Sequence, residues 1–479
     1  MASNSIDHDT LSHIEQYVTT IHRQLRIPGL AIAIVQDGTV VYQRGLGEAF
    51  PGRPTTPLAP FILGSLSKSF TALAIMQLVE AGKLNLDERV QHYIPWFHIE
   101  GNKASVGGDL LSAQITIRHL LCHTSGISRY EGRKLLSSSN SGTLEEAVRD
   151  LHHVQLLAHI GVTHLVGSTF QYSNANYTIL GYLIEVVSGQ SYSDYLQQHI
   201  FSPLNMHNSC TSEQKAIQHQ LAQGYRWWFG FPMPFQAPYL TEAVPAAFIV
   251  SSVEDMAKYL IACLDAGKSG GALLSRQGFE EMYAPQGLMK RDDNFNYGFG
   301  WRTGIYVGEK MLRHGGEVSN FRADMVMLPG RKLGVVVLAN CNNGMVAQLG
   351  LDQIALNMIR LLLGQPLPRK TLTFRGFYTL VDLLVVAISL VQIGSLVQFL
   401  RSSSMRRPAR VGISSVLAMI GAVISPVVLL WQLPKWADMP WRGLLLYVPD
   451  VSRWVVIMSA ISIVKSVIRL YTCLSKEKR

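Results

Sequence analysis

Cysteine is scarce in this chain of 479 residues, which has five, an odd number, widely scattered and without a C-x-x-C pair. Disulfide frameworks and structural zinc sites need cysteines in pairs or at close spacing, so neither is expected. A G-x-G-x-x-G sequence is also missing, and dinucleotide binding of the usual kind is excluded with it. These absences leave a chain for which no cofactor and no metal is expected.

Charge is also sparse, because only 16% of the residues are Asp, Glu, Lys or Arg, and the net charge of +9 is unevenly placed. From residue 366 onward there are 15 basic and 4 acidic residues, whereas the preceding part has 27 basic and 29 acidic ones. The basic excess therefore belongs to the C-terminal part. The long N-terminal part has no basic patch, and no nucleic-acid partner is expected.

The C-terminal part contains three apolar runs, Phe377 to Leu400, Val411 to Trp431 and Trp454 to Cys473. Each is close to the 20 residues that span a bilayer. Lys465 and Arg469 interrupt the third run and would have to reach toward one membrane face, so two spans with an interfacial third helix are the alternative. The expected organisation is a folded domain over 1–365, a linker over 366–376, transmembrane helices over 377–473 and a basic tail over 474–479.

The basic residues of this region suggest an orientation. Arg401, Arg406, Arg407 and Arg410 follow the first run, and with three spans they share one membrane side with the basic tail. The positive-inside rule makes that side cytoplasmic, which puts the folded domain outside, at the inner membrane of a bacterium. Residues 1–26 are polar and show no secretory signal, so either the true start lies upstream or the orientation is reversed.

The chemistry is expected around Ser65 and Lys68, which lie three residues apart where an apolar segment, 61–64, enters a helical pattern over 71–80. Residues at this spacing share one face of a helix. A serine becomes a nucleophile when a neighbouring group takes its proton, and a lysine does so where burial keeps its amine neutral. Ser65 is therefore the candidate nucleophile, although the same spacing at Ser212, Ser462 and Ser475 shows that S-x-x-K alone is weakly specific.

Three further pieces of sequence bear on the site. Tyr172-x-Asn174 opens a helical pattern, and on its own it indicates an asparagine helix cap beside a packed tyrosine. His119 and His123 have metal-ligand spacing but lack a third ligand, and they are expected to cap and pack a short helix. The aromatic segment 225–235 suits either a cleft wall or a surface that rests on a membrane.

The remaining pattern predicts β-structure at both ends of the domain. Residues 31–35 and 39–44 form an expected hairpin, and strands are expected at 297–301, 311–317, 323–328 and 333–340, with a closing helix over 346–363.

Ser65-x-x-Lys68, Tyr172-x-Asn174 and His314-Gly315-Gly316, in this order, resemble the serine β-lactamase and penicillin-binding-protein superfamily, in its class C-like branch (peptidase S12). The similar segments are 64–70, 84–90, 115–127, 170–189, 203–206, 297–301 and the stretch from 314 to the turn at 329, within residues 20–345. The resemblance implies an α+β fold of two lobes, an antiparallel sheet flanked by helices and a mostly helical lobe, with the site between them.

The resemblance also implies roles for individual residues. Ser65 would be acylated, Lys68 would hold the network that activates it, and Tyr172 would relay the proton to the leaving group and later activate water. Asn174 would hydrogen-bond Lys68 and the substrate amide. The backbone N–H groups of Ser65 and Glu317 would form the oxyanion hole.

The remaining residues of the set concern the substrate. Gly315 and Gly316 would leave a strand without side chains for the substrate, and His314 stands where β-lactamases have lysine, which favours a peptidase or esterase.

The tail resembles that of membrane-bound D-peptidases that remove an N-acyl-D-amino-acid cap from peptide prodrugs. Ile62 and Asn174 stand where polar cap-reading residues are expected in those enzymes, so their specificity does not carry over. The expected function is a membrane-anchored serine hydrolase acting on a small peptide, amide or ester. The alternatives are a penicillin-binding sensor that acylates and turns over slowly, and a catalytically idle scaffold, against which the intact set Ser65, Lys68 and Tyr172 argues.

Overall fold

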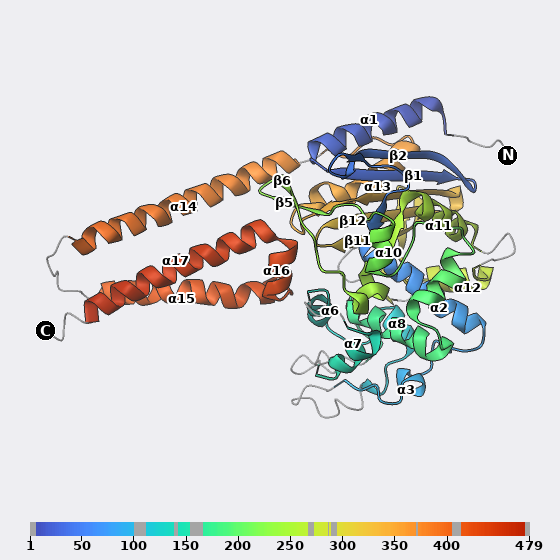
Figure 1. Cartoon of the computed structure of the whole chain (residues 1–479), viewed down its shortest axis with the longest axis horizontal. Helices are drawn as coiled ribbons and strands as arrows, with labels where there is room; N and C mark the ends of the chain where they lie inside the picture. The colour runs from blue at the N-terminus through green and yellow to red at the C-terminus, as the bar shows by residue number, and fades with distance from the viewer. Residues whose placement is uncertain are drawn as a thin grey trace. The chain divides into compact units, whose positions relative to one another are not determined.

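The chain is described by a computed structural model that divides into two compact units, whose elements are drawn in Figure 1. The first unit contains residues 1–227 and 231–371, and the second contains residues 228–230 and 372–479. The described residues are 6–99, 112–137, 142–153, 166–266, 273–285, 287–288, 295–369, 372–404 and 413–474.

A nine-stranded antiparallel sheet forms one lobe of the first unit. Its strand order is β3-β2-β1-β13-β12-β11-β10-β9-β8, so strands from both ends of this unit meet in the middle of the sheet. The bounds are β1 (Gly29–Gln36), β2 (Thr39–Phe50), β3 (Arg53–Pro54), β8 (Gly287–Leu288), β9 (Phe295–Tyr297), β10 (Arg302–Tyr306), β11 (Glu309–Val318), β12 (Phe321–Leu328) and β13 (Leu333–Ala339). The predicted hairpin is confirmed as β1 and β2, and the register of β1 on β13 places Ile32 opposite Val337.

Both faces of the central strands are buried because helices cover the sheet on both sides. Along β1, Ala31 and Ala33 belong to the main hydrophobic core, whereas the alternate residues Leu30 and Ile32 are buried outside it. Helix α11 contributes to the main core, while α1 and α13 pack on each other and bury residues outside it. These helices are α1 (His8–Gln24), α11 (Val253–Asp265) and α13 (Ile354–Leu362).

The second lobe is mainly helical and is built around α2 and α8 (Figure 1). The other helices of the first unit are α2 (Ser67–Glu80), α3 (Val90–Tyr93), α5 (Ile117–Leu121), α6 (Arg129–Leu135), α7 (Leu144–Asp150), α8 (Asn174–Ser188), α9 (Tyr192–Leu196), α10 (Glu213–Gln218) and α12 (Arg276–Tyr283). Short helical turns are η1 (Gly64–Leu66), η2 (Leu151–His153), η3 (Gln197–Phe201), η4 (Thr241–Ala243), η5 (Val244–Phe248), η6 (Pro329–Arg331), η7 (Ala347–Leu349) and η8 (Leu351–Gln353). Two small sheets consist of β14 (Cys341–Asn342), β5 (Tyr225–Trp228) and β6 (Phe231–Pro234), and of β4 (Pro60–Ile62) and β7 (Val250–Ser252).

Two predicted elements need correction. The predicted strand 297–301 ends at Tyr297, because the next residues form a turn in which Gly300 has a φ of +72°. The predicted helix 346–363 begins only at Ile354, since Gly350 interrupts it and the preceding residues form the turns η7 and η8.

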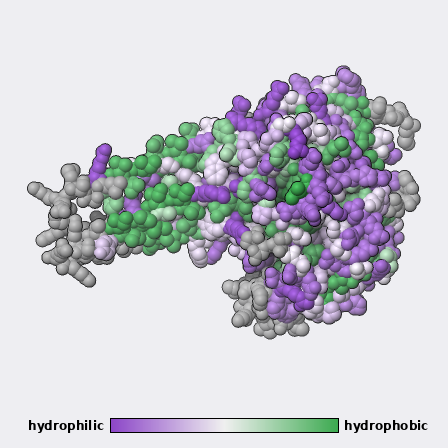
Figure 2. All heavy atoms as spheres, in the orientation of Figure 1, coloured by the Kyte–Doolittle hydropathy of each residue, from purple (hydrophilic) through white to green (hydrophobic). Residues whose placement is uncertain are grey.

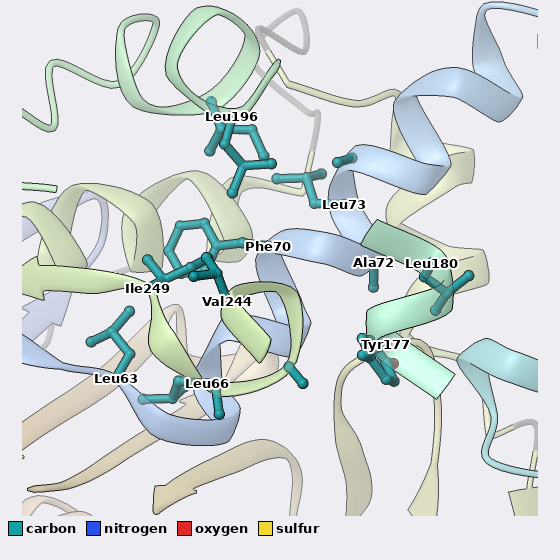
Figure 3. Packing of buried hydrophobic residues seen from close by; sticks show 14 of the residues in the cluster. Leu63, Leu66, Phe70, Ala72, Leu73, Tyr177, Leu180, Leu196, Val244 and Ile249 are labelled. Atoms are coloured by element: carbon teal, nitrogen blue, oxygen red, sulfur yellow. The ribbon is translucent and has the colours of Figure 1, made fainter. Parts of the chain in front are cut away.

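Close packing fixes the start of α2. Phe70 stacks on Tyr259 of α11 with ring centroids 4.0 Å apart, and it lies next to Val244 and Ile249 (Figure 3). Leu63 and Leu66, on either side of Ser65, are fully buried in the same core. The residues that precede α2 are therefore held rigidly from both sides.

Four helices form most of the second unit: α14 (Phe374–Ser404), α15 (Ile413–Trp436), α16 (Trp441–Tyr447) and α17 (Pro449–Leu474). By length and composition two helical stretches of the described residues are apolar enough to cross a membrane, Phe374–Phe399 and Pro449–Ile468. The predicted second span, 411–431, lies partly outside the described residues. Apolar side chains cover the visible face of these helices (Figure 2). Lys465, in the third predicted span, donates a hydrogen bond to Ser395 Oγ of α14 at 2.8 Å.

Candidate active site

Ser65 lies in the turn η1, two residues before the first residue of α2, and Lys68 lies in the first turn of that helix. Lys68 Nζ is 3.1 Å from Ser65 Oγ. The turn is tied to the segment that follows η5, because Leu63 N–H donates to Ile249 O and Ile249 N–H donates to Ser67 Oγ. The structure thus brings the predicted serine and lysine into direct contact on a fixed support.

The ammonium group of Lys68 is fully buried and its partners are neutral oxygens. Besides Ser65, Nζ donates to Asn174 Oδ1 and to Ala246 O, both at 2.7 Å. Burial therefore holds the pKa of Lys68 well below its usual range. The amide and carbonyl oxygens can only accept, so they take two N–H bonds of the amine. The remaining tetrahedral position, which faces Ser65, carries the lone pair when Lys68 is neutral.

Asn174 is the first residue of α8, and its amide is fixed from both sides. Its Nδ2 donates to Gly132 O at 3.3 Å, which turns Oδ1 toward Lys68. The interpretation of Asn174 as a helix cap is wrong, since the cap position belongs to Ser173, which makes no capping hydrogen bond with its side chain.

Tyr172 lies in the extended segment before α8, and its ring centroid is 4.9 Å from Lys68 Nζ. Burial raises the pKa of Tyr172 to about 12, although a hydrogen bond with the Ser65 side chain and the nearby Arg302 and Arg129 oppose the rise. The phenol is consequently protonated at neutral pH, while the amine beside it tends to be neutral. Ser65 thus has a potential proton acceptor and a potential proton donor as neighbours.

His314 lies on β11 and is buried. Burial and the positive charge of Arg302 hold the pKa of His314 well below its usual range, which favours the neutral ring. Its Nδ1 lies 2.8 Å from Gly315 O, which can only accept, so the ring proton is on Nδ1. Nε2 then accepts from the Tyr297 hydroxyl at 3.0 Å.

Gly64 in the Ser65 turn and Gly316 on β11 have no side chains, so the two backbones can lie in direct contact. A Cβ on Gly64, whose φ is +56°, would lie 2.1 Å from Glu317 N, and a Cβ on Gly316 would lie 1.8 Å from Leu63 O. Gly315 differs, because its nearest neighbours would be 3.9 Å away. The Glu317 side chain turns aside to an ion pair with Arg322 at 2.7 Å.

Several residues at this site were not predicted from the sequence. Ala246 contributes only a carbonyl, which has no signal in sequence, and Tyr297 stood in a predicted strand without a role. His119 does cap α5, in a capping box with Thr116. His123, expected beside it on the helix, lies beyond the helix end and packs against the Tyr172 ring, with centroids 4.3 Å apart.

An antiparallel sheet, a helical lobe and a serine, lysine and tyrosine held together in one site define the class of β-lactamase-fold serine hydrolases. The chain belongs to the Beta-lactamase family, whose sequence profile matches residues 13–357. The predicted family and the α+β fold class are thereby confirmed.

Among curated relatives, the chain is 28% identical to Protein flp of Staphylococcus aureus (strain MW2) over 341 residues, 70% of this chain and 64% of flp. The chain therefore matches less than two thirds of that relative's length. It is 27% identical to Unguisins hydrolase ungD' of Aspergillus campestris, over 71% of this chain and 62% of that protein.

Among solved structures, the octameric penicillin-binding protein homologue from Pyrococcus abyssi shares 29% identity with a TM-score of 0.64, over 74% of this chain and 78% of that one. EstCE1, described as a hydrolase with promiscuous acyltransferase activity, has a TM-score of 0.63 at 24% identity, over 75% of this chain and all of that one, and it supports the fold.

Proposed function

We propose that this chain is a membrane-anchored serine hydrolase that acts on a peptide, amide or ester through an acyl intermediate on Ser65. One observation carries the proposal. The Lys68 amine is buried within 3.1 Å of Ser65 Oγ, and its other two partners are neutral oxygens. A lysine in such surroundings can accept the serine proton at moderate pH.

In the acylation step, Ser65 Oγ attacks the substrate carbonyl carbon and its proton passes to Lys68 Nζ. The negative charge on the carbonyl oxygen is stabilised by the backbone N–H groups of Ser65 and Glu317. When the tetrahedral intermediate collapses, the bond to the leaving amine or alcohol breaks and the leaving group takes the phenolic proton of Tyr172. Lys68 returns its proton to Tyr172, and the acyl-enzyme remains.

Deacylation reverses these roles. Water attacks the acyl carbon and gives its proton to the network of Tyr172 and Lys68, and Ser65 Oγ recovers a proton as it leaves. The products are a carboxylic acid and the resting enzyme. Asn174 holds Lys68 in place through its Oδ1, and we also assign it the binding of a substrate amide.

The state of His314 bears on the substrate class. The corresponding position in β-lactamases is a lysine, a cation that suits a carboxylate, whereas His314 is buried, neutral and occupied by Tyr297. This supports a D-amino-acid peptide, an acyl-peptide prodrug or an ester over a β-lactam as substrate. A relative named as a hydrolase of unguisins also supports hydrolysis.

Membrane anchoring is proposed from the second unit. Leu383 and Val391 of α14 are 63% and 73% exposed, and a bilayer would cover such apolar side chains. With α15 as a third span, the basic residues 401–410 and 474–479 would lie on one side, which the positive-inside rule makes cytoplasmic. We place the hydrolase domain on the extracytoplasmic side of a bacterial inner membrane.

The test is the intact mass of detergent-solubilised full-length protein after incubation with a fluorophosphonate or, separately, with a penicillin. A single fluorophosphonate adduct that is absent in Ser65→Ala is the expected result. A penicillin adduct that persists for hours favours a penicillin-binding sensor, in line with the likeness to a penicillin-binding protein homologue. Folded protein without an adduct from either reagent overturns the hydrolase assignment.

A further inference from the structure

His123 contacts the Tyr172 ring and the two residues that flank Tyr172, and the proposed chemistry does not use it. Its carbonyl oxygen accepts a hydrogen bond from Gln171 N–H at 2.7 Å, and its Nδ1 accepts one from Ser173 N–H at 3.2 Å. Its ring packs against the Tyr172 ring with centroids 4.3 Å apart. One residue thus holds the backbone on both sides of the tyrosine as well as the tyrosine ring.

The backbone of His123 is in the left-handed region, with a φ of +59°. This conformation is strained for a residue with a side chain and persists only where the surroundings enforce it. With this backbone conformation, both the main-chain carbonyl and the side chain of His123 contact the segment 171–173.

The protonation state of the ring follows from its partners. Nδ1 accepts from Ser173 N–H and lies 3.1 Å from the Asn176 amide nitrogen, so the single ring proton is on Nε2. Nε2 has no hydrogen-bond partner in the described part of the chain. It is enclosed by aromatic rings, with Tyr297 at 4.8 Å and Phe170 at 5.9 Å between centroids. A residue that served only to fill space would not require a buried imidazole in this conformation.

We propose that His123 is a positioning residue that fixes the phenol of Tyr172 against Ser65. The inference rests on the proposed function, because it gives Tyr172 a part in the reaction. Displacement of a reacting group by about 1 Å can lower a rate about 100-fold, so the hold on both flanks of Tyr172 has a measurable consequence.

The experiment compares kcat for hydrolysis of a peptide anilide, whose leaving amine needs a proton from Tyr172, in full-length protein in detergent. His123→Phe keeps an aromatic ring but loses the Nδ1 acceptor, whereas His123→Asn keeps an acceptor at a similar place and tolerates a positive φ. We expect His123→Phe to lower kcat for the anilide at least about tenfold and His123→Asn to retain it within about threefold. His119→Asn is the matched control, because it perturbs the preceding helix without touching Tyr172.

A double-mutant cycle with Tyr172→Phe separates positioning from a general structural role. If His123 acts through Tyr172, His123→Phe lowers the rate in the wild-type background but changes it less than about twofold in the Tyr172→Phe background. An equal loss in both backgrounds, or a wild-type rate for folded His123→Phe, overturns the inference. If His123→Phe does not fold, His123→Gly, which removes the ring and suits the backbone, takes its place in the cycle.

The two proposals fail differently. Wild-type protein that is not labelled at Ser65 refutes the proposed function. Wild-type protein that is labelled, together with a folded His123 variant that reacts equally fast, refutes only the positioning role.

Discussion

Two adjacent glycines on β11, Gly315 and Gly316, should respond differently to substitution by alanine: we expect only one of the two variants to lose activity on a small ester. Neither has a positive φ, so the backbone accepts alanine at both positions. A methyl group on Gly316 would lie 1.8 Å from Leu63 O and 3.2 Å from Leu66 N, whereas one on Gly315 would meet nothing closer than 3.9 Å. The two substitutions have the same chemistry and differ only in the space they enter.

The magnitude follows from these contacts. Van der Waals contact needs about 3.5 Å, so Gly316→Ala must push β11 away from the Ser65 turn by roughly 1.5 Å. That movement separates the N–H groups of Ser65 and Glu317, which the proposed oxyanion hole needs together. Loss of one such donor costs about 10²- to 10³-fold in rate. Gly315→Ala should leave this geometry intact and affect only substrates that lie along the strand.

The assay is hydrolysis of a small p-nitrophenyl ester and of a peptide anilide, with the melting temperature of each variant as a control for folding. We expect Gly316→Ala to lose at least about 100-fold in kcat on both substrates. For Gly315→Ala we expect ester hydrolysis within about threefold of wild type and a raised KM for the larger substrate. Equal losses in the two variants, or full ester activity in Gly316→Ala, would refute the assignment of the oxyanion hole.

Three further predictions concern protons. The fold lowers the pKa of Lys68, so below the ordinary lysine pKa the unfolded chain binds more protons than the folded chain. In denaturant titrations the free energy of unfolding of wild type should therefore rise relative to Lys68→Met by up to about 1.4 kcal/mol per pH unit as pH rises toward 10. A difference that does not depend on pH contradicts the burial argument. Asn174→Asp puts a carboxylate beside the amine and should move the acid limb of the labelling-rate profile up by about 1 to 3 pH units, and an unmoved limb excludes Lys68 as the base. Tyr172→Phe should slow anilide hydrolysis by about 10²- to 10⁴-fold and p-nitrophenyl ester hydrolysis less, since nitrophenolate leaves without a proton, and equal losses would remove Tyr172 from leaving-group protonation.

The parts of the site that were predictable are those with a distinctive residue type at a fixed spacing. Ser65 and Lys68 are three residues apart at a helix start, so local geometry alone brings them together. Tyr172 and His314 could be joined to them only through the family resemblance, because their proximity depends on the fold of the whole first unit. The role of the Ala246 carbonyl could not be predicted from the sequence, since any residue type can supply a carbonyl.

The secondary structure was predictable where side-chain alternation and turn residues agree, as in β1 and β2. The prediction failed where a glycine ends an element that the apolar pattern would continue. The strand expected through Trp301 stops at Tyr297, because the turn at Gly298 and Gly300 overrides the apolar pattern. His123 was misplaced for a related reason. Its spacing from His119 suggested one helix face, but α5 ends at Leu121 and the positive φ of His123 redirects the chain toward Tyr172.

Burial favours the uncharged forms of Lys68, Tyr172, His123 and His314, and this explains how the site can be both buried and reactive. Burial lowers the pKa values of Lys68, His314 and His123 and raises that of Tyr172. A buried cation or anion here would cost several kcal/mol, whereas neutral groups with satisfied hydrogen bonds cost little. Charge then develops only during the reaction, between an amine that gains a proton and a carbonyl oxygen that becomes negative. Because α2, α8 and the segment at Ala246 together keep Lys68 neutral, the reactivity of Ser65 depends on the completed fold and not on its local sequence.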